Sequence, residues 1–325
     1  MKISVVIPNY NGEKLLPKNI PRVVTVLNEY CQKHSTTIQL VICDDASKDS
    51  SATYLKELEK KSTDGKVSYT IGIREKNGGF SANVNYGVSL ATGDILILLN
   101  TDVIPEKGFL EPLIKHFKDE NVFAVGCMDK SVEENGQIVL RGRGIGSWVR
   151  GFLQHGKGDL AMSNTLWVSG GSGAFSKKIW DVVGGLTELM NPFYWEDIDI
   201  SYRAQKFGYV VRFEKDSIVR HEHEAGSIKQ NTKPFKVRVI SYRNQFYFVW
   251  LNISDWSLML SHIIWLPFHI FSAAKGKDVA FLKGFSLAML SLVFVLRQRA
   301  LNLRRFKISD KIILGQFAKE SSNDI

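Results

Sequence analysis

The sequence predicts an α/β fold, in which a mainly parallel sheet lies between helices and a helical region follows it. Three features predict this fold. Short apolar strands alternate with helices over the first hundred residues, polar clusters follow successive strands, and the excess basic charge lies in one late stretch. The chain has 325 residues, of which 44% are hydrophobic, so it can bury a core as two domains or as one large domain with an appendage. This composition excludes a disordered chain and a fibrous repeat.

The first hundred residues are predicted to form alternating strands and helices. An apolar strand at 3–8, a helix at 15–33 with apolar residues at helical spacing, and a second apolar strand at 38–43 form one strand–helix–strand unit. Such a unit places its two strands parallel in one sheet. The elements expected next are a helix at 51–61, a strand at 67–73, a helix at 81–91 and a buried strand at 94–99.

Beyond Pro105 the pattern continues with less regular elements. These are a helix near 107–119, a strand at 122–127, a glycine-rich loop or hairpin at 141–158, a glycine-rich turn at 168–175 before a helix from Ser176, a helix that opens at 195–199, and a short strand at 209–213.

The net charge of +9 is concentrated in one part of the chain. Residues 1–235 carry 29 basic and 28 acidic side chains, residues 236–307 carry 11 and 2, and residues 308–325 carry 2 and 3. The first segment is therefore nearly neutral, and the second holds the whole excess. We accordingly expect one domain at 1–235 and a basic, apolar helical region at 236–325.

Two apolar segments in the basic stretch, 256–274 and 284–296, predict membrane-associated helices. The first contains Pro267, two histidines and three serines, and its polar side chains fall on one side of a helix and leave a wide apolar face. The second has 13 residues before Arg297, short of the roughly 20 needed to cross a bilayer. Basic residues lie at the ends of both segments, at 275–283 and 297–307. Helices with basic ends suit the headgroup region of an anionic membrane. The alternative is a pair of core helices with solvated ends. Nucleic acid is not an expected partner, because aliphatic runs separate the basic residues.

The three cysteines, Cys31, Cys43 and Cys127, are widely spaced and form no metal-binding pattern. They encode neither a disulfide framework nor a zinc site, so a reducing compartment is expected. The opening apolar run, residues 1–8, is too short for the core of a signal peptide.

Polar clusters follow three of the predicted strands: PNYNG at 8–12, DDASKDS at 44–50 and NTD at 100–102. Ligands of parallel sheets bind beyond the carboxyl ends of the strands, so the three clusters together predict a binding site, although each alone is an ordinary turn or helix cap. Asp44 and Asp45 can accept hydrogen bonds from a base or a ribose. The first strand–helix turn lacks a phosphate-binding glycine loop, and Asp102 beside Asn100 offers a place for Mg²⁺ or Mn²⁺ that would offset a diphosphate.

Four ordered motifs resemble those of family 2 glycosyltransferases with the GT-A fold, in particular the rhamnosyltransferase-like branch. They are SVVIPNYNG (4–12), VICDDASKDSS (41–51), NGGFSANVNYGVSLATGDILILLNTDV (77–103) and YWEDIDISYRAQKFGY (194–209). The resemblance covers residues 1 to about 225. It implies a Rossmann-like domain for nucleoside diphosphate sugars and an inverting, metal-assisted transfer to an acceptor hydroxyl. Residues 1–105 would form the nucleotide-sugar half and residues 106–235 the acceptor half.

The resemblance also implies roles for individual residues. Those implied to bind the nucleotide sugar are Pro8, Tyr10, Asn11, Asp44, Asp45, Asn77, Gly78, Gly79, Asn83, Asn100 and Thr101. Asp102 matches the last residue of the metal-binding DxD motif, from which the chain departs because Asn100 stands where Asp is common. Gly171, Ser172 and Trp195 are implied to border the acceptor; a tight strand-to-helix connection is the alternative explanation of the first two.

The acidic helix start WEDID at 195–199 is implied to carry the general base. Acidic residues also favour helix starts, and Asp199 with Arg203 forms an ordinary helical pair, but neither explains the adjacent Tyr194 and Trp195. In the resembled family, Asp197 aligns with the base that takes the acceptor proton on the face opposite the leaving diphosphate. Glu196 is its implied companion at the acceptor hydroxyl.

The resemblance further implies a metal-ligating histidine after the acidic helix. We expect His221 to bind the metal with Asp102, and His223 is the alternative, which the sequence does not separate from it. A solvated turn is the commoner explanation of such a histidine pair.

The sequence thus predicts a hexosyltransferase-type enzyme at the cytoplasmic face of the cell membrane. It would move a sugar from a UDP- or dTDP-sugar to a glycan or lipid-linked acceptor in cell-surface polysaccharide synthesis. The alternatives are a polyprenyl-phosphate sugar synthase, which shares the N-terminal motifs, and a catalytically silent membrane-bound scaffold of the same fold.

Overall fold

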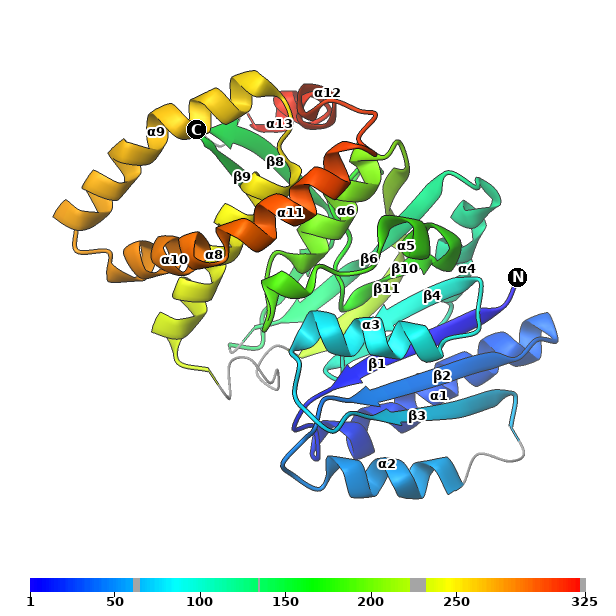
Figure 1. Cartoon of the computed structure of the whole chain (residues 1–325). Coiled ribbons are helices and arrows are strands. Elements are labelled where there is room, and N and C mark those ends of the chain that lie inside the picture. The colour runs from blue at the N-terminus through cyan, green and yellow to red at the C-terminus, as the bar shows by residue number, and fades with distance from the viewer. Residues whose placement is uncertain (61–64, 134, 223–231, 322–325) are drawn as a thin grey trace.

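The computed structural model describes residues 1–60, 65–133, 135–222 and 232–321. Its centre is a nine-stranded sheet of order β3-β2-β1-β4-β10-β6-β11-β5, with β7 beside β6 (Figure 1). Strands β1 to β4 are parallel, and β10 lies antiparallel between β4 and β6. The strands are β1 (Ile3–Asn9), β2 (Ile38–Asp44), β3 (Val67–Ile73), β4 (Ile95–Leu99), β5 (Val103–Pro105), β6 (Val122–Val132), β7 (Ile138–Arg141), β10 (Ser172–Ser176) and β11 (Val210–Glu222).

Helices cover both faces of the sheet. Val5 packs into one core cluster together with residues of helix α1, and Val6 packs into the other with residues of α3 and α5, because successive side chains of a strand point to opposite faces. This two-sided burial explains why the central strands are almost entirely apolar. The helices are α1 (Leu15–His34), α2 (Ser51–Lys60), α3 (Phe80–Leu90), α4 (Leu110–Ile114), α5 (Lys177–Val183) and α6 (Glu196–Lys206).

A third core cluster joins the C-terminal helices to the rest of the molecule. It contains residues of α6, of the hairpin β8 (Gly144–Val149) and β9 (Phe152–Lys157), and of the helices after Pro234. In Figure 1, α9 and α10 extend away from the sheet and α11 leads back toward it, whereas α8 and α12 contribute to the shared core. These helices are α8 (Pro234–Asn252), α9 (Trp256–Lys275), α10 (Val279–Leu290), α11 (Leu292–Leu303), α12 (Asp310–Gly315) and α13 (Ala318–Ser321).

The α/β architecture is confirmed, and four expected elements differ. The apolar segment at 284–296 is not one helix, because it is divided at Ser291 between α10 and α11, which are bent by 67°. The helix near 107–119 is shorter, α4 followed by the 3₁₀ helix η1 (Lys115–Lys118), because Gly108 has a φ of +78°. The strand at 209–213 is only the start of β11, which continues across a polar run at 214–217 with a register shift. The turn at 168–175 includes the first residues of β10, a strand rich in small residues.

Candidate active site

The predicted polar clusters lie at one edge of the sheet. Strands β1, β2 and β4 are parallel, so the residues after their last positions emerge on the same side. Strand β10 is antiparallel, and its first residue, Ser172, pairs with Leu99 at the end of β4. The glycine-rich turn before β10 therefore reaches the same edge as Asn100, and the backbone N–H of Asn100 donates to the carbonyl of Gly171 at 2.9 Å.

Asp44 holds the ends of β1 and β2 together. Its side chain is buried, and its Oδ1 accepts hydrogen bonds from Asn9 Nδ2 and from the Ser47 hydroxyl, both at 2.6 Å. The backbone N–H of Ser47 donates to Oδ2 at 2.9 Å. Both carboxylate oxygens are thus engaged with the protein, and Asp44 shapes the loop beside the site. Asn9 is part of this network and was not among the predicted site residues.

Asp45 organises the predicted nucleotide loop at 77–79. Its carboxylate accepts from the backbone N–H groups of Gly78 at 2.9 Å and Gly79 at 2.8 Å, and from the Arg74 guanidinium at 2.9 Å. Asn77 Nδ2 donates to the Asp45 carbonyl at 3.1 Å. The structure brings these predicted residues together and adds Arg74, which was not predicted. Arg74 directly follows β3, and this position after a strand could have identified it from the sequence.

Two predicted asparagines have structural partners at this edge. Asn83 Nδ2 donates to carbonyls at the ends of β1 and β2, at 3.2 and 2.9 Å, and its buried Oδ1 has no protein partner. Asn11 has a φ of 53° and accepts from the backbone N–H of Lys48 at 2.9 Å. Pro8 is buried within β1, and Tyr10 is half-buried beside it.

Asp102 and His221, which the resemblance implies as metal ligands, lie close together in the structure. Asp102 directly precedes Val103, which pairs with His221 where β5 and β11 run side by side. Oδ2 of Asp102 is 3.4 Å from Nε2 of His221. The preceding residue, Thr101, has its carbonyl fixed by Asn19 Nδ2 at 2.8 Å.

Asp129 on β6 completes this cluster. Its Oδ2 lies 3.0 Å from Nδ1 of His221, so the imidazole stands between two carboxylates. Burial lowers the pKa of His221, but its hydrogen bonds with Asp102 and Asp129 outweigh this effect and raise the pKa to about 9. The sequence carried no local signal for Asp129, because only the parallel register of β6 and β11 brings it here.

The donor atoms at Asp102 and His221 fit a divalent cation that keeps further positions for substrate oxygens. A carboxylate and an imidazole are two ligands, and a carboxylate on the other imidazole nitrogen is the arrangement that orients metal-bound histidines. Among the residues that the structure describes, no group of three or more His, Cys, Asp or Glu side chains is arranged to hold a metal by itself. His223, the alternative ligand, lies outside the described residues.

Two adjacent glycines, Gly170 and Gly171, lie between the edge of the sheet and the start of helix α6. A Cβ atom on Gly171 would lie 2.3 Å from Nδ2 of Asn100, and one on Gly170 would lie 3.8 Å from Cβ of Asp197. Gly171 thus lies against Asn100, and the neighbouring Gly170 lies beside Asp197. The predicted acceptor turn and the predicted base therefore border one site.

The two acids that open α6 differ in exposure and in hydrogen bonding. Asp197 is partly exposed, and its Oδ1 accepts from the backbone N–H of Ile198 at 2.8 Å. Burial raises the pKa of Asp197 to about 6, although backbone hydrogen bonds oppose the rise. Glu196 is buried, its Oε2 has no protein partner, and burial together with the charge of Asp197 raises its pKa well above the usual range. A carboxylate with a pKa near neutrality suits a general base.

Trp195, predicted to border the acceptor, is mostly buried and belongs to the core shared with α8. Its ring lies 5.4 Å from that of Phe248 and 5.0 Å, edge to face, from that of His155 on β9. The hairpin β8–β9 corresponds to the loop or hairpin that the sequence predicts at 141–158. Through His155 it reaches the start of α6.

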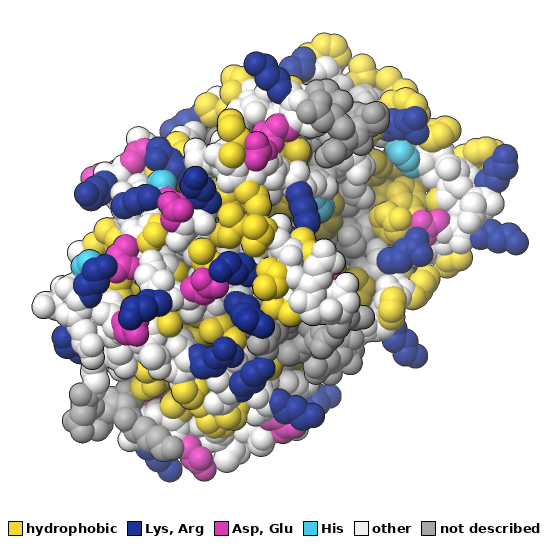
Figure 2. Space-filling view, turned by 180° about the vertical axis from the view of Figure 1, so that it is seen from behind, with side chains coloured by type: hydrophobic (Ala, Val, Ile, Leu, Met, Phe, Trp, Pro, Cys, Tyr) yellow, Lys and Arg dark blue, Asp and Glu magenta, His cyan; other side chains and the backbone are white. Residues whose placement is uncertain are grey.

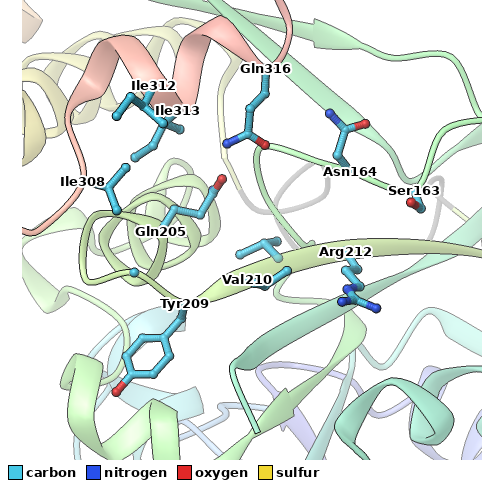
Figure 3. A pocket seen from close by; sticks show the side chains of 12 residues that line it. Ser163, Asn164, Gln205, Tyr209, Val210, Arg212, Ile308, Ile312, Ile313 and Gln316 are labelled. Carbon is cyan, nitrogen blue, oxygen red and sulfur yellow. The ribbon is translucent and has the colours of Figure 1, made fainter. Parts of the chain in front are cut away.

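A pocket of about 430 Å³ lies away from these residues, between the end of α6, the start of β11 and α12 (Figure 3). Gln205, Arg212 and Asn164 face it together with isoleucines of the α12 segment. None of the predicted site residues lines it, and we assign it no part in the chemistry.

Comparison with known proteins identifies related chains. Residues 4–182 match the family model described as Glycosyl transferase family 2. The chain is 21% identical over 225 residues to the O-antigen chain rhamnosyltransferase RfbN of Salmonella typhimurium, covering 69% of this chain and 67% of that protein. It is 37% identical over 103 residues to the undecaprenyl-phosphate 4-deoxy-4-formamido-L-arabinose transferase of Salmonella choleraesuis, covering 31% of this chain and 29% of that protein.

Solved structures share the fold at low sequence identity. GalNAc-T7 in complex with UDP, GalNAc and Mn²⁺ has a TM-score of 0.67 and 17% identity, covering 100% of this chain and 58% of that one. S. aureus TarS 1-349 in complex with UDP-GlcNAc has a TM-score of 0.56 and 15% identity, covering 98% and 92%. The mannosyltransferase PcManGT from Pyrobaculum calidifontis, with GDP-Man and Mn²⁺, has a TM-score of 0.53 and 14% identity, covering 99% and 80%. These likenesses show the GT-A fold.

Proposed function

The chain belongs to glycosyl transferase family 2, and from this premise we propose that it transfers a sugar, with inversion, from a nucleoside diphosphate sugar to a hydroxyl of a glycan or lipid-linked acceptor. The match to a rhamnosyltransferase of O-antigen synthesis supports a role in cell-surface polysaccharide synthesis. UDP and GDP sugars in the structural neighbours support a nucleotide-sugar donor. UDP- and dTDP-sugars are the donors to be tried first.

The observation that carries this proposal is Asp197 beside the glycine turn that reaches Asn100. The acceptor hydroxyl enters on the side of Asp197, and its oxygen forms a bond to the anomeric carbon while the bond from that carbon to the diphosphate oxygen breaks. The acceptor proton passes to the carboxylate of Asp197. A pKa of about 6 keeps Asp197 ionised, and so able to accept the proton, at neutral pH. Glu196 precedes it in the chain as a buried companion whose pKa is raised.

Asp102 and His221 are the residues that would hold Mg²⁺ or Mn²⁺. Mn²⁺ in two structural neighbours supports this assignment. Such an ion, when bound, supplies positive charge to the diphosphate. Asp129 fixes the orientation of the His221 imidazole through Nδ1 at 3.0 Å, which leaves Nε2 directed at Asp102.

The reaction is tested by combining donor binding with turnover. UDP, dTDP and GDP are screened by thermal shift with and without Mn²⁺, and the sugars of the stabilising nucleotide are then assayed with glycan, lipid-linked and polyprenyl-phosphate acceptors. We expect turnover that rises with pH through about 6, because the deprotonated Asp197 is the active form. Asp197→Asn should lose about 10²- to 10⁴-fold in kcat and keep nucleotide binding. Normal turnover by this variant would remove Asp197 from the mechanism, and transfer to the phosphate acceptor alone would favour the synthase alternative.

The exposed side of the C-terminal helices supports a membrane location. Helix α9 is long and apolar enough to cross a membrane, with a mean hydropathy of 1.4, and only 11% of that segment is buried. Ile264 is 64% exposed and Phe271 68%, and on α10 and α11 Leu290 is 80% and Val293 76% exposed. Figure 2 shows hydrophobic side chains where α9 and α10 project, with Lys and Arg at the rim. An apolar surface with a basic rim fits an anionic membrane.

Contacts of α9 with the hairpin β8–β9 favour a helix that lies on the membrane. His262 Nδ1 donates to the Gly151 carbonyl and His269 Nε2 to the Arg150 carbonyl, each at 2.7 Å. If α9 crossed the bilayer, this irregular turn would enter the hydrocarbon region, where unsatisfied backbone is costly. Helices α10 and α11 are bent by 67° and do not form one straight span. We therefore propose monotopic attachment, at the cytoplasmic face that the unpaired cysteines predict.

Full-length variants test the membrane proposal, because α8 and α12 belong to the shared core and cannot be removed without exposing it. Ile264→Glu with Leu290→Glu should release the protein from phosphatidylglycerol vesicles in sedimentation assays, since both exposed apolar contacts are lost. Ile138→Glu, at a 53% exposed position on β7, is the matched control and should bind like the wild type. Unchanged sedimentation of the double variant, or failure of the wild type to bind, would contradict the proposal.

A further inference from the structure

The two residues before the acidic pair have a backbone conformation that side chains rarely adopt. Tyr194 and Trp195 have φ values of 72° and 73°. A residue with a Cβ atom meets steric repulsion there, and two such residues in succession persist only where the surroundings hold them. Glu196 and Asp197 come directly after them, so this turn sets the direction in which the proposed base points.

A single buried amide on α8 holds this turn. Asn244 is fully buried, and its Nδ2 lies within hydrogen-bond distance of three backbone carbonyls, those of Met190 at 2.6 Å, Phe193 at 3.0 Å and Tyr194 at 2.8 Å. An amide group has two hydrogens, so at least one of these bonds is shared. The three carbonyls span the loop that enters the strained turn.

Arg243 fixes the amide and joins the same loop to the donor side. Its Nε and Nη2 donate to Oδ1 of Asn244 at 2.9 and 2.8 Å, and Nη2 also donates to the Asn191 carbonyl. The Oδ1 atom of Asn191 in turn accepts from the backbone N–H of Ser81 at 2.9 Å, and its side chain packs where a Cβ on Gly79 would lie. Asn244 therefore holds the loop that leads to the proposed base, and Arg243 links that loop, through Asn191, to the residues beside the nucleotide loop.

Helix α8 is a firm support for these two side chains. Helix α10 packs on it so closely that a Cβ on Gly284 would lie 2.8 Å from Cβ of Tyr242 and 3.1 Å from the backbone N of Arg243. Catalytic geometry is held best by groups on packed helices or strands.

We propose that Asn244, supported by Arg243, is a positioning residue that holds the left-handed turn at Tyr194 and Trp195 and so places Asp197 for proton transfer. This inference rests on the proposed function of Asp197. It assigns to α8, which lies outside residues 4–182 of the family match and in the basic C-terminal region, a part in the active site.

The test compares two buried asparagines of the same helix. Asn252 is equally buried, and its Nδ2 donates to Asp199 Oδ1 at 2.7 Å, so it supports α6 without touching the turn. Asn244→Ala should lower kcat about 10- to 100-fold, the loss expected when a reacting group is misplaced by about 1 Å, with little change in donor KM. Asn252→Ala should lower the unfolding midpoint to a similar degree and leave kcat near that of the wild type. Equal kcat for the two variants would overturn the proposal.

A second variant and a second measurement test the same proposal. Arg243 is only half-buried, so we expect Arg243→Met to fold. This variant should have a lower kcat and also a higher donor KM, because the hydrogen bond to the Asn191 carbonyl is lost. Amide hydrogen exchange at residues 193–198 should be faster in Asn244→Ala than in Asn252→Ala. If the wild type turns over no sugar nucleotide, the proposed function fails while the exchange rates still decide whether Asn244 holds the turn. Unchanged exchange in Asn244→Ala would contradict that role.

Discussion

The sheet edge carries several of the proposed site residues itself, whereas the C-terminal helices hold α6 and the loop before it. At the edge, Asp45 and Asp102 come directly after strands, so their position in the sequence already indicates where they lie. On the C-terminal helices, single polar residues are spaced far apart in an apolar, basic stretch, and each reaches back to α6 or to the loop before it. Asn244 and Asn252 are examples, bonded to groups 50 to 54 and 53 residues away in sequence. The comparison shows that the C-terminal helices expose apolar side chains on their outer side, while single polar side chains on their inner side hold α6 and the loop before it.

The inward side of these helices is centred on α6. Asp199 accepts from Thr187 at 2.7 Å, from Arg203 Nη2 at 2.7 Å and from Asn252 at 2.7 Å. One turn or more further on, Lys206 pairs with Asp310 of α12. A carboxylate or ammonium can be buried only when such partners are present, so the C-terminal segment and α6 depend on each other.

Of the substitutions that test the contacts between α6 and the C-terminal segment, Asp310→Asn is expected to lower the free energy of unfolding most. Lys206 Nζ lies 2.9 Å from Asp310 Oδ1, and both side chains are fully buried. The variant leaves the ammonium of Lys206 without a counter-charge, and we expect the free energy of unfolding to fall by about 3–5 kcal/mol in urea denaturation. Asp181→Asn is the control; its partner Lys177 is one helical turn away at the surface, and the expected loss is below about 1 kcal/mol. Similar losses in the two variants would mean that the C-terminal segment is not integral to the fold.

The sequence predicted the sheet edge well because its information is local. The strands at 3–8, 38–43 and 67–73 agree closely with β1, β2 and β3, and parallel pairing brings the residues just beyond these strands together. His221 was expected near Asp102 from a family resemblance, and the register of β5 and β11 places it there. The role of Asp197 as base remains a prediction, as does the division of the chain at residue 235.

The remaining residues depend on pairings between segments that are distant in sequence. Asp129 meets His221 only through the register of β6 and β11, across a shift that a polar run at 214–217 concealed. Asn244 is one asparagine in a helix whose other buried residues are almost all apolar. Its importance comes from three carbonyls that no local pattern reveals. Long-range contacts of single polar side chains are therefore the part that the sequence did not disclose.

A smaller effect is expected from Glu196→Gln, at the start of the helix α6 that the C-terminal segment supports. Burial and the neighbouring Asp197 raise the pKa of Glu196 above its usual value, so the folded protein binds this proton more tightly than the unfolded chain does. Stability contributed in this way is present below the unfolded pKa and is lost as the pH rises toward the folded one. Gln carries no charge to bury, so in urea denaturation the variant should match the free energy of unfolding of the wild type near pH 4 and exceed it at pH 8. Glu57→Gln, at an exposed position on α2, should track the wild type throughout. A pH dependence left unchanged by Glu196→Gln would contradict a raised pKa for Glu196.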